Sequence, residues 1–321
     1  MVTPNGEGVA VRDVRRSFGP VQAVRGISLR AAPGEVTALV GPNGAGKTTL
    51  LLILATLLTP DAGELRVAGH DPVTEPDAVR ARMGWSPDFF GMYDNLTARE
   101  YLEFFAAAYR LPRAAARDRA AELLELARLA EYGDQPVHVL SRGQKQRLAL
   151  TRALVHRPAV LLLDEPAAGL DPHSRVELRV LLRRLAAEGA AVLVSSHILS
   201  DLEEMADRVV FVDQGVTVGE HHMSDLPRVE RRTWRIRALD HGALVAALSG
   251  RGRPESSWVD VELESEQAAA ELVAELVGKG VMVTAFAPVG GALEAAYLEL
   301  VDEDAPVQQI VLHPVQQEVR R

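Results

Sequence analysis

The feature that most constrains this chain is a glycine-rich run after an apolar segment, with the sequence Gly41-Pro42-Asn43-Gly44-Ala45-Gly46-Lys47-Thr48. Glycine adopts backbone conformations closed to other residues, so the N–H groups of such a loop can point together at phosphate oxygens. A helix predicted to start at Gly46 adds positive potential at its N-terminus. A strand, a glycine-rich loop and a helix in this order predict a phosphate-binding P-loop in an α/β fold.

Two side chains of the P-loop have chemical roles of their own. We expect Lys47 to neutralise the β- and γ-phosphates of a nucleotide, and the Thr48 hydroxyl to be a direct Mg²⁺ ligand. An incidental lysine in a glycine-rich turn is the alternative, and the motifs that follow argue against it. The other residues of this loop predicted to bind nucleotide are Gly41, Pro42, Asn43, Gly44, Ala45, Gly46 and Thr49.

Charged and polar residues follow two further apolar segments. Asp164 and Glu165 come directly after the segment 159–163, and His197 comes shortly after the segment 190–195. Both segments read as buried parallel strands, and ligands of open α/β sheets bind at the carboxyl ends of such strands. The alternative interpretations are an acidic pair that only caps a strand and a histidine that only enters a helix.

A fourth motif lies between the P-loop and the acidic pair: Leu140-Ser141-Arg142-Gly143-Gln144. With it, residues 8–225 resemble the ATP-binding cassette (ABC) family, whose motifs occur here in the family's order. The resemblance implies a P-loop NTPase cassette at residues 1–225, with an antiparallel β subdomain, a mixed central sheet and an all-helical insert at about residues 88–156. It also implies the ATPase subunit of a transporter, with ATP and Mg²⁺ as cofactors.

The resemblance assigns roles to the polar residues near the phosphates. Asp164 is expected to hold Mg²⁺ through water, and Glu165 to orient and deprotonate the attacking water as general base. His197 is expected to contact the γ-phosphate. Phe18, at the end of the first strand, matches the aromatic residue that stacks on adenine, although a lone aromatic could instead belong to the core.

Other matches concern pairing between subunits. By resemblance, Ser141, Gly143 and Gln144 cap the γ-phosphate bound to the opposite subunit. The chain has one copy of each motif, so the second cassette must be another copy in a homodimer, or a related cassette. Asp171, in Gly169-Leu170-Asp171-Pro172, matches the loop that communicates between the paired sites, and a simple turn is its alternative.

One residue departs from the family pattern. Asp88 stands where the family usually has glutamine, and its added charge is expected either to join the magnesium ligands or to slow turnover. The neighbouring Phe89, Phe90 and Tyr93 are expected to be exposed where a helix of an integral membrane permease docks, with local core packing as the alternative.

Residues 226–304 are expected to form a small α/β accessory domain, and 305–321 a flexible tail. This extension resembles that of exporter ATPases working beside separate permeases; an importer ATPase and a soluble non-transport cassette are the alternatives.

Composition narrows the possible locations and partners. The 321 residues include no cysteine, and the net charge of -9 argues against general nucleic-acid binding. The sequence shows neither a signal peptide nor an apolar run of the roughly 20 residues needed to cross a bilayer. We therefore expect a peripheral subunit at the cytoplasmic face of the cell membrane.

Periodicity and turn residues predict the elements of both domains. In the cassette, strands are predicted at 9–14, 21–29, 35–40, 159–163, 190–195, 209–212 and 216–219, and helices at 46–59, 113–130, 147–155 and 174–187. Thr97 and Glu100 form a capping-box pattern that starts another helix, ending at Pro112. In the accessory domain, strands are predicted at 233–238, 257–263 and 281–285, and helices at 241–248, 267–277 and 293–301.

Overall fold

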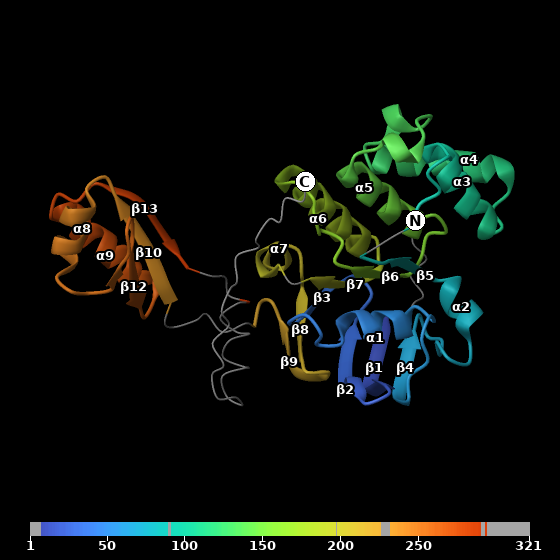
Figure 1. Ribbon diagram of the computed structural model, residues 1–321, viewed down its shortest axis with the longest axis horizontal. Coiled ribbons are helices and arrows are strands. Elements are labelled where there is room, and N and C mark those ends of the chain that lie inside the picture. The colour runs from blue at the N-terminus through green and yellow to red at the C-terminus, as the bar shows by residue number, and fades with distance from the viewer. Residues whose placement is uncertain (1–7, 89–90, 197, 226–231, 290–292, 294–321) are drawn as a thin grey trace, which may run out of the picture. The chain divides into compact units, whose positions relative to one another are not determined.

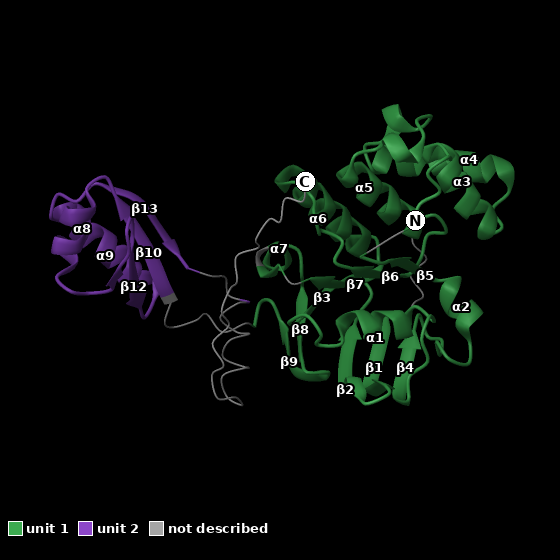
Figure 2. Ribbon diagram, in the orientation of Figure 1, with its two compact units in different colours: residues 1–227 green, residues 228–321 purple. Residues whose placement is uncertain are grey.

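The chain forms two compact units. The computed structural model describes residues 8–88, 91–196, 198–225, 232–289 and 293. Figure 2 colours the two units, which comprise residues 1–227 and 228–321. Each has a hydrophobic core of its own.

Unit 1 is built on one mixed sheet of nine strands in the order β4-β1-β2-β9-β8-β3-β7-β6-β5 (Figure 1). Its strands are β1 (Val9–Phe18), β2 (Val21–Ala31), β3 (Val36–Val40), β4 (Ala62–Val67), β5 (Met83–Ser86), β6 (Val160–Asp164), β7 (Ala191–Ser196), β8 (Arg208–Asp213) and β9 (Val216–His222). The strands β5, β6, β7, β3 and β8 run parallel, whereas β1 pairs antiparallel with β2 and β4. The predicted mixed sheet with an antiparallel part is thus confirmed, and Gly26 of β2 joins the two parts by pairing with Val216 of β9.

The helix α1 (Lys47–Leu54) fills the space between the two parts of this sheet. Its run Leu50, Leu51, Ile53 and Leu54 has no exposed surface. Burial of each such side chain contributes roughly 1.5–3 kcal/mol. The start of α1, which carries the end of the P-loop, is therefore anchored in the core.

Further helices cover unit 1. They are α2 (Pro76–Arg80), α3 (Ala98–Ala108), α4 (Arg113–Leu126), α5 (Arg142–Ala153), α6 (Pro172–Ala187) and α7 (Leu199–Glu203), with 3-10 turns at Ala130–Tyr132 and Val137–Val139. The helices α3, α4 and α5 lie between β5 and β6 in sequence and pack on one another. The predicted capping box starts α3: the Glu100 N–H donates to Thr97 Oγ1 at 3.1 Å and the Thr97 N–H to Glu100 Oε2 at 2.9 Å.

Several predicted boundaries were wrong. The first helix ends at Leu54 rather than near residue 59, because Thr56 takes a left-handed conformation with φ 63°. The helix predicted at 113–130 ends at Leu126, and Arg128 is likewise left-handed with φ 52°. The helix predicted from 147 begins at Arg142. The elements β4, α2 and α7 had not been predicted.

The described part of unit 2 is a four-stranded antiparallel sheet with the helices α8 and α9. Its elements are β10 (Arg232–Ala238), α8 (His241–Leu248), β11 (Arg253–Pro254), β12 (Val259–Leu263), α9 (Glu266–Gly278) and β13 (Val283–Pro288), and its strand order is β11-β12-β10-β13. This chain order and sheet order are those of a ferredoxin-like β-α-β-β-α-β unit. Ile236, Leu244 and Leu276 have no exposed surface and form the centre of its core. The helix predicted at 293–301 and the predicted tail lie outside the described residues, apart from Leu293.

None of the helices in the described ranges is both long enough and apolar enough to span a bilayer.

Candidate nucleotide site

The P-loop holds its lysine inward. The Lys47 side chain is only 7% exposed, and its ammonium donates to the carbonyl oxygens of Gly41 at 2.7 Å and Pro42 at 3.0 Å. Burial lowers the pKa of Lys47, while the nearby Glu165 and Asp164 carboxylates act in the opposite direction. A phosphate entering the loop would offer this ammonium a charged acceptor, which forms stronger hydrogen bonds than neutral carbonyls do.

Two glycines of this loop are required by close contacts. A Cβ on Gly41 would lie 2.0 Å from the Val212 carbonyl oxygen, and one on Gly46 would lie 2.5 Å from the Ala23 carbonyl oxygen. Gly46 also has φ 95°, a conformation that costs other residues roughly 1–2 kcal/mol. The P-loop is therefore seated tightly against the ends of β8 and β2. Thr48, in the first turn of α1, is exposed and available to a ligand.

The acidic pair lies at the carboxyl end of β6, beside the end of β7. Asp164 is 2% exposed, and its Oδ1 accepts a hydrogen bond from the Ser195 hydroxyl at 2.5 Å. The Glu165 N–H donates to Ser195 Oγ at 3.2 Å and to the Ser195 carbonyl oxygen at 3.1 Å. Glu165 has φ 48°, a left-handed conformation that residues other than glycine rarely adopt outside functional sites or turns. The structure thus brings Lys47, Asp164 and Glu165 into one site, and Ser195 was not predicted.

A second group of predicted residues meets at the starts of α5 and α6. The Ser141 hydroxyl accepts from the Gln144 N–H at 3.3 Å, while the Gln144 side chain accepts from the Ser141 N–H at 2.8 Å. This capping box explains why α5 begins earlier than predicted. A Cβ on Gly143 would lie 4.0 Å from Asp171 Oδ2, so the glycine is a close neighbour of Asp171.

Asp171 is fixed at the N-terminus of α6. Its carboxylate accepts from the Ser174 N–H at 3.1 Å and from the Ser174 hydroxyl at 2.6 Å, and these bonds lower the pKa of Asp171. The preceding Gly169 has φ 71°, and a Cβ there would lie 2.8 Å from the Arg142 guanidinium. The loop at 169–171 therefore packs directly on the start of α5.

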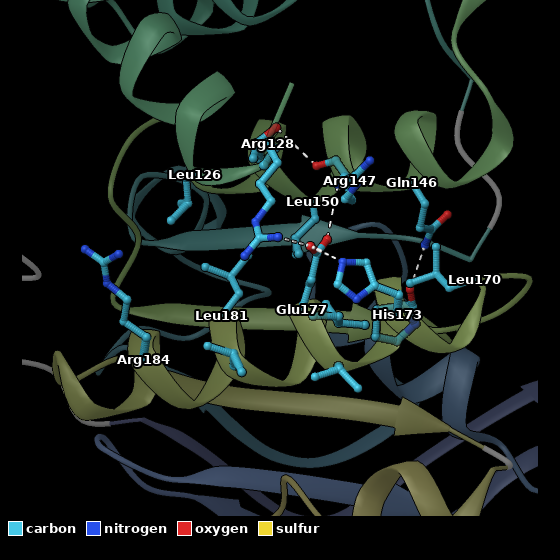
Figure 3. Close-up of a pocket in the computed structure, with 16 residues that line it drawn as sticks. Leu126, Arg128, Gln146, Arg147, Leu150, Leu170, His173, Glu177, Leu181 and Arg184 are labelled. Atoms are coloured by element: carbon cyan, nitrogen blue, oxygen red, sulfur yellow. Dashed lines mark hydrogen bonds and ion pairs between the residues drawn. The ribbon is translucent and has the colours of Figure 1, made fainter. Parts of the chain in front are cut away.

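The helix α5 is also tied to the acidic site and to α6. The Gln146 side chain donates to the carbonyl oxygen of Pro166, the residue after Glu165, at 3.1 Å. Behind this bond lies a groove of about 340 Å³ between α5 and α6, the α5–α6 groove (Figure 3). In it, Arg128, Arg147 and His173 point toward the Glu177 carboxylate, at 2.6, 3.2 and 3.0 Å. Sequence reasoning found neither Gln146 nor this cluster.

The remaining predicted residues lie around these two groups. Phe18 ends β1, is 44% exposed rather than part of the core, and has the Arg16 guanidinium 4.9 Å from its ring centre. Asp88 is exposed on the loop after β5. His197, Phe89 and Phe90 lie outside the described residues.

A larger open groove separates the end of α1, α2 and β5 from α3 and α5; we call it the α1–α3 groove. Its volume is about 800 Å³. Its lining includes the apolar side chains Leu57, Trp85, Phe105 and Tyr109 and the cations Arg80, Arg110 and Arg152. Beside it, Tyr93 packs edge-on against Phe104 with ring centres 5.1 Å apart, yet both rings remain about half exposed, at 54% and 48%.

Comparison with known proteins agrees with this arrangement. Residues 24–168 match the family model described as ABC transporter. The chain is 41% identical over 218 residues to the daunorubicin resistance ATP-binding protein DrrA3 of Streptomyces coeruleorubidus, covering 68% of this chain and 69% of the relative. It is 40% identical to the Nod factor export ATP-binding protein I of Paraburkholderia xenovorans, covering 64% of this chain and 68% of that protein.

Solved structures are similar as well. One is described as the ATP-binding subunit of an ABC transporter, with TM-score 0.63, 29% identity and coverage of 68% of this chain and 92% of that one. Another is a dimeric ATP-binding cassette in a post-hydrolysis state bound to ADP and Pi, with TM-score 0.61, 28% identity and coverage of 67% and 98%.

Proposed function

This chain belongs to the ABC transporter family as an ATP-binding ATPase subunit, and we propose that it hydrolyses ATP at the site of Lys47 and Glu165 to drive an exporter permease. The observation that carries the proposal is the convergence of the buried Lys47 ammonium with Asp164 and Glu165 beneath the P-loop. Export as the direction is supported by the relatives named for daunorubicin resistance and Nod factor export.

In the proposed reaction, this chain positions the phosphates and one water molecule. The P-loop N–H groups and Lys47 bind the β- and γ-phosphates and balance the charge that develops on them. Glu165 accepts the proton of the attacking water as general base. Its backbone conformation, held by the end of β7, would aim the carboxylate. By the family resemblance, His197 would contact the γ-phosphate.

The donors present suit magnesium. Thr48 offers an exposed hydroxyl, and Asp164 offers a carboxylate with one oxygen bonded to Ser195. The described residues contain no group of three histidine or acidic side chains that could hold a metal by themselves. Mg²⁺ is often held by only one or two protein ligands together with substrate phosphates, so this sparse set fits it. When bound, the ion would neutralise phosphate charge; Asp88 is a further candidate ligand.

We infer that the active form is a pair of cassettes. Ser141, Gly143, Gln144 and Asp171 form one surface group at the starts of α5 and α6, where they would face the nucleotide of a second copy or a related cassette. A solved relative of similar fold is a dimer bound to ADP and Pi, which supports this arrangement. Head-to-tail pairing would then place two ATP molecules between the subunits.

The permease is proposed to dock in the α1–α3 groove. Leu57 is 58% exposed there, and Phe105 and Tyr109 add aromatic surface. Three arginines line the groove against one acid, Asp77, which already pairs with Arg80. A short permease helix with apolar and acidic side chains fits this chemistry. Such docking would hold the subunit at the cytoplasmic face of the membrane.

Glu165→Gln tests the catalytic assignment. We expect ATP hydrolysis to fall roughly 100-fold or more, the loss typical of a missing general base, while an ATP-bound dimer accumulates in size-exclusion chromatography. Lys47→Ala should fail earlier, at phosphate binding, and form no such dimer. Glu131→Gln, on an exposed residue remote from the P-loop in sequence, is the control. Near-parental hydrolysis by Glu165→Gln would contradict the assigned role.

Leu57→Glu tests the docking surface. Hydrolysis by the isolated subunit should stay close to the parental rate, whereas recovery of the complex with the permease should fall, because a carboxylate replaces exposed apolar surface. Val180→Glu is the matched control, since Val180 is similarly exposed, at 61%, but lies on α6. Equal recovery of both variants would argue against docking in this groove.

A further inference from the structure

We propose that the buried hydroxyl of Ser195 is a positioning group that sets the aim of both Asp164 and Glu165, and thereby the strength of Mg²⁺–ATP binding and the rate of hydrolysis. The inference deepens the proposed function and rests on it. None of the motifs in the sequence includes Ser195, because it lies two residues before His197 in an apolar strand.

The first support is the hydrogen bonding of the Ser195 side chain. Its Oγ donates to Asp164 Oδ1 at 2.5 Å and accepts from the Glu165 N–H at 3.2 Å. Ser195 has no exposed surface, so water does not compete for these bonds. One hydroxyl therefore connects the carboxylate of the proposed metal ligand with the backbone of the proposed general base.

The second support is the role of these bonds in the local conformation. The bond to Oδ1 restricts the rotation of the Asp164 carboxylate and so fixes the orientation in which it would help to hold Mg²⁺. Glu165 is held at φ 48°, a strained conformation that persists only where the surroundings hold it. The pairing of Asp164 with Ser195 in the parallel ladder of β6 and β7 supplies that hold.

The third support is the contrast with another buried hydroxyl of the same sheet. Thr37 on β3 also has no exposed surface, and its Oγ1 has no hydrogen-bond partner among the described residues. It pairs with Leu193 on β7, two residues before Ser195. Both hydroxyls are buried in neighbouring strands, but only that of Ser195 bonds the acidic pair. Thr37→Val is therefore a matched control, since it removes a buried hydroxyl while keeping the shape of the side chain.

The experiment compares the full-length parent, Ser195→Ala, Ser195→Thr and Thr37→Val. Isothermal titration calorimetry measures ATP affinity with Mg²⁺ and with EDTA, and steady-state assays give kcat and the Mg²⁺ concentration for half-maximal rate. For Ser195→Ala we expect the ATP affinity measured with EDTA to be unchanged. The increase in ATP affinity caused by Mg²⁺, or kcat, should fall roughly 10–100-fold, as it does for other residues that orient metal ligands. Ser195→Thr, which keeps the hydroxyl, and Thr37→Val should stay within about 3-fold of the parent on the same measures.

Two results would overturn the inference. One is a Ser195→Ala variant for which kcat and the increase in ATP affinity caused by Mg²⁺ both equal those of Thr37→Val. The other is a Ser195→Thr variant that melts with the parent yet behaves like Ser195→Ala, because the hydroxyl would then not be responsible. A failure of the proposed function would look different: the parent itself would hydrolyse ATP no faster than Glu165→Gln.

Discussion

The carboxylate of Glu177 is predicted to hold the helix that carries Ser141, Gly143 and Gln144 against α6. Its side chain is only 16% exposed; it accepts a hydrogen bond from Arg147, 24% exposed, and lies within ion-pair distance of the more exposed Arg128 and His173. Exposed ion pairs contribute about 0–1 kcal/mol, whereas breaking a buried pair costs about 3–5 kcal/mol. The Arg147 pair lies between these limits, so Glu177→Ala should lower the free energy of unfolding of unit 1 by about 2 kcal/mol.

Thermal unfolding followed by circular dichroism measures this effect. For a unit of this size, about 2 kcal/mol corresponds to a Tm decrease of roughly 4–8 °C. The control is Glu188→Ala, at the end of the same helix, whose carboxylate is 39% exposed and pairs with Arg184, 65% exposed. It should change stability by at most about 0.5 kcal/mol. A double-mutant cycle with Arg147→Ala should give a coupling energy of about 1–2 kcal/mol.

The same substitution should weaken assembly more than nucleotide binding. In a Glu165→Gln background, Glu177→Ala should reduce the ATP-dependent dimer, because α5 is less firmly held, while ATP affinity of the monomer stays near the parental value. If Glu177→Ala has the same Tm as Glu188→Ala, and the double-mutant cycle with Arg147→Ala gives no coupling energy, the cluster does not join the two helices.

Four further outcomes are expected. Burial lowers the pKa of His156 from 6.5 to about 4, so the unfolded chain takes up the proton at a higher pH than the folded chain does. The free energy of unfolding should therefore fall as the pH drops from about 6.5 to 4. When Tm is measured against pH, His156→Phe should show a smaller decrease over this range. Asp88→Asn should weaken Mg²⁺-dependent hydrolysis and spare metal-free ATP binding; an unchanged Mg²⁺ titration would mark Asp88 as a surface carboxylate. A chain ending at Pro227 should still bind ATP, and a folded truncation that cannot would show that the domain boundary is misplaced. Gly46→Ala should abolish measurable ATP binding, since its Cβ would lie 2.5 Å from a carbonyl oxygen and its φ of 95° is strained, and retained binding would mean that the loop can shift.

Some helix boundaries that were predicted wrongly had a signal in the sequence. The start of α5 is an example, because Ser141 and Gln144 have the spacing of a capping box, as Thr97 and Glu100 do. The early ends of α1 and α4 had no comparable signal. They follow from left-handed conformations at Thr56 and Arg128, which neither residue type favours by itself.

The sequence by itself determined the P-loop, the acidic pair and most strands and helices of the cassette, because each depends on spacing within a few residues; β4, α2 and α7 were not among the predicted elements. The glycines that permit the loop, the apolar runs of the strands and the charged residues at their ends are all local patterns. The predicted role of Asp88 is tested by Asp88→Asn, and the predicted roles of Phe18 and His197 remain predictions.

Only the tertiary structure decided which distant side chains meet. Ser195 reaches Asp164 because β6 and β7 are neighbours in register, and Gln146 reaches Pro166 because α5 packs against the loop after β6. The Glu177 cluster likewise joins residues from three segments. Such contacts depend on strand order and helix packing, which arise from burial of apolar surface over the whole unit and from no single stretch of sequence.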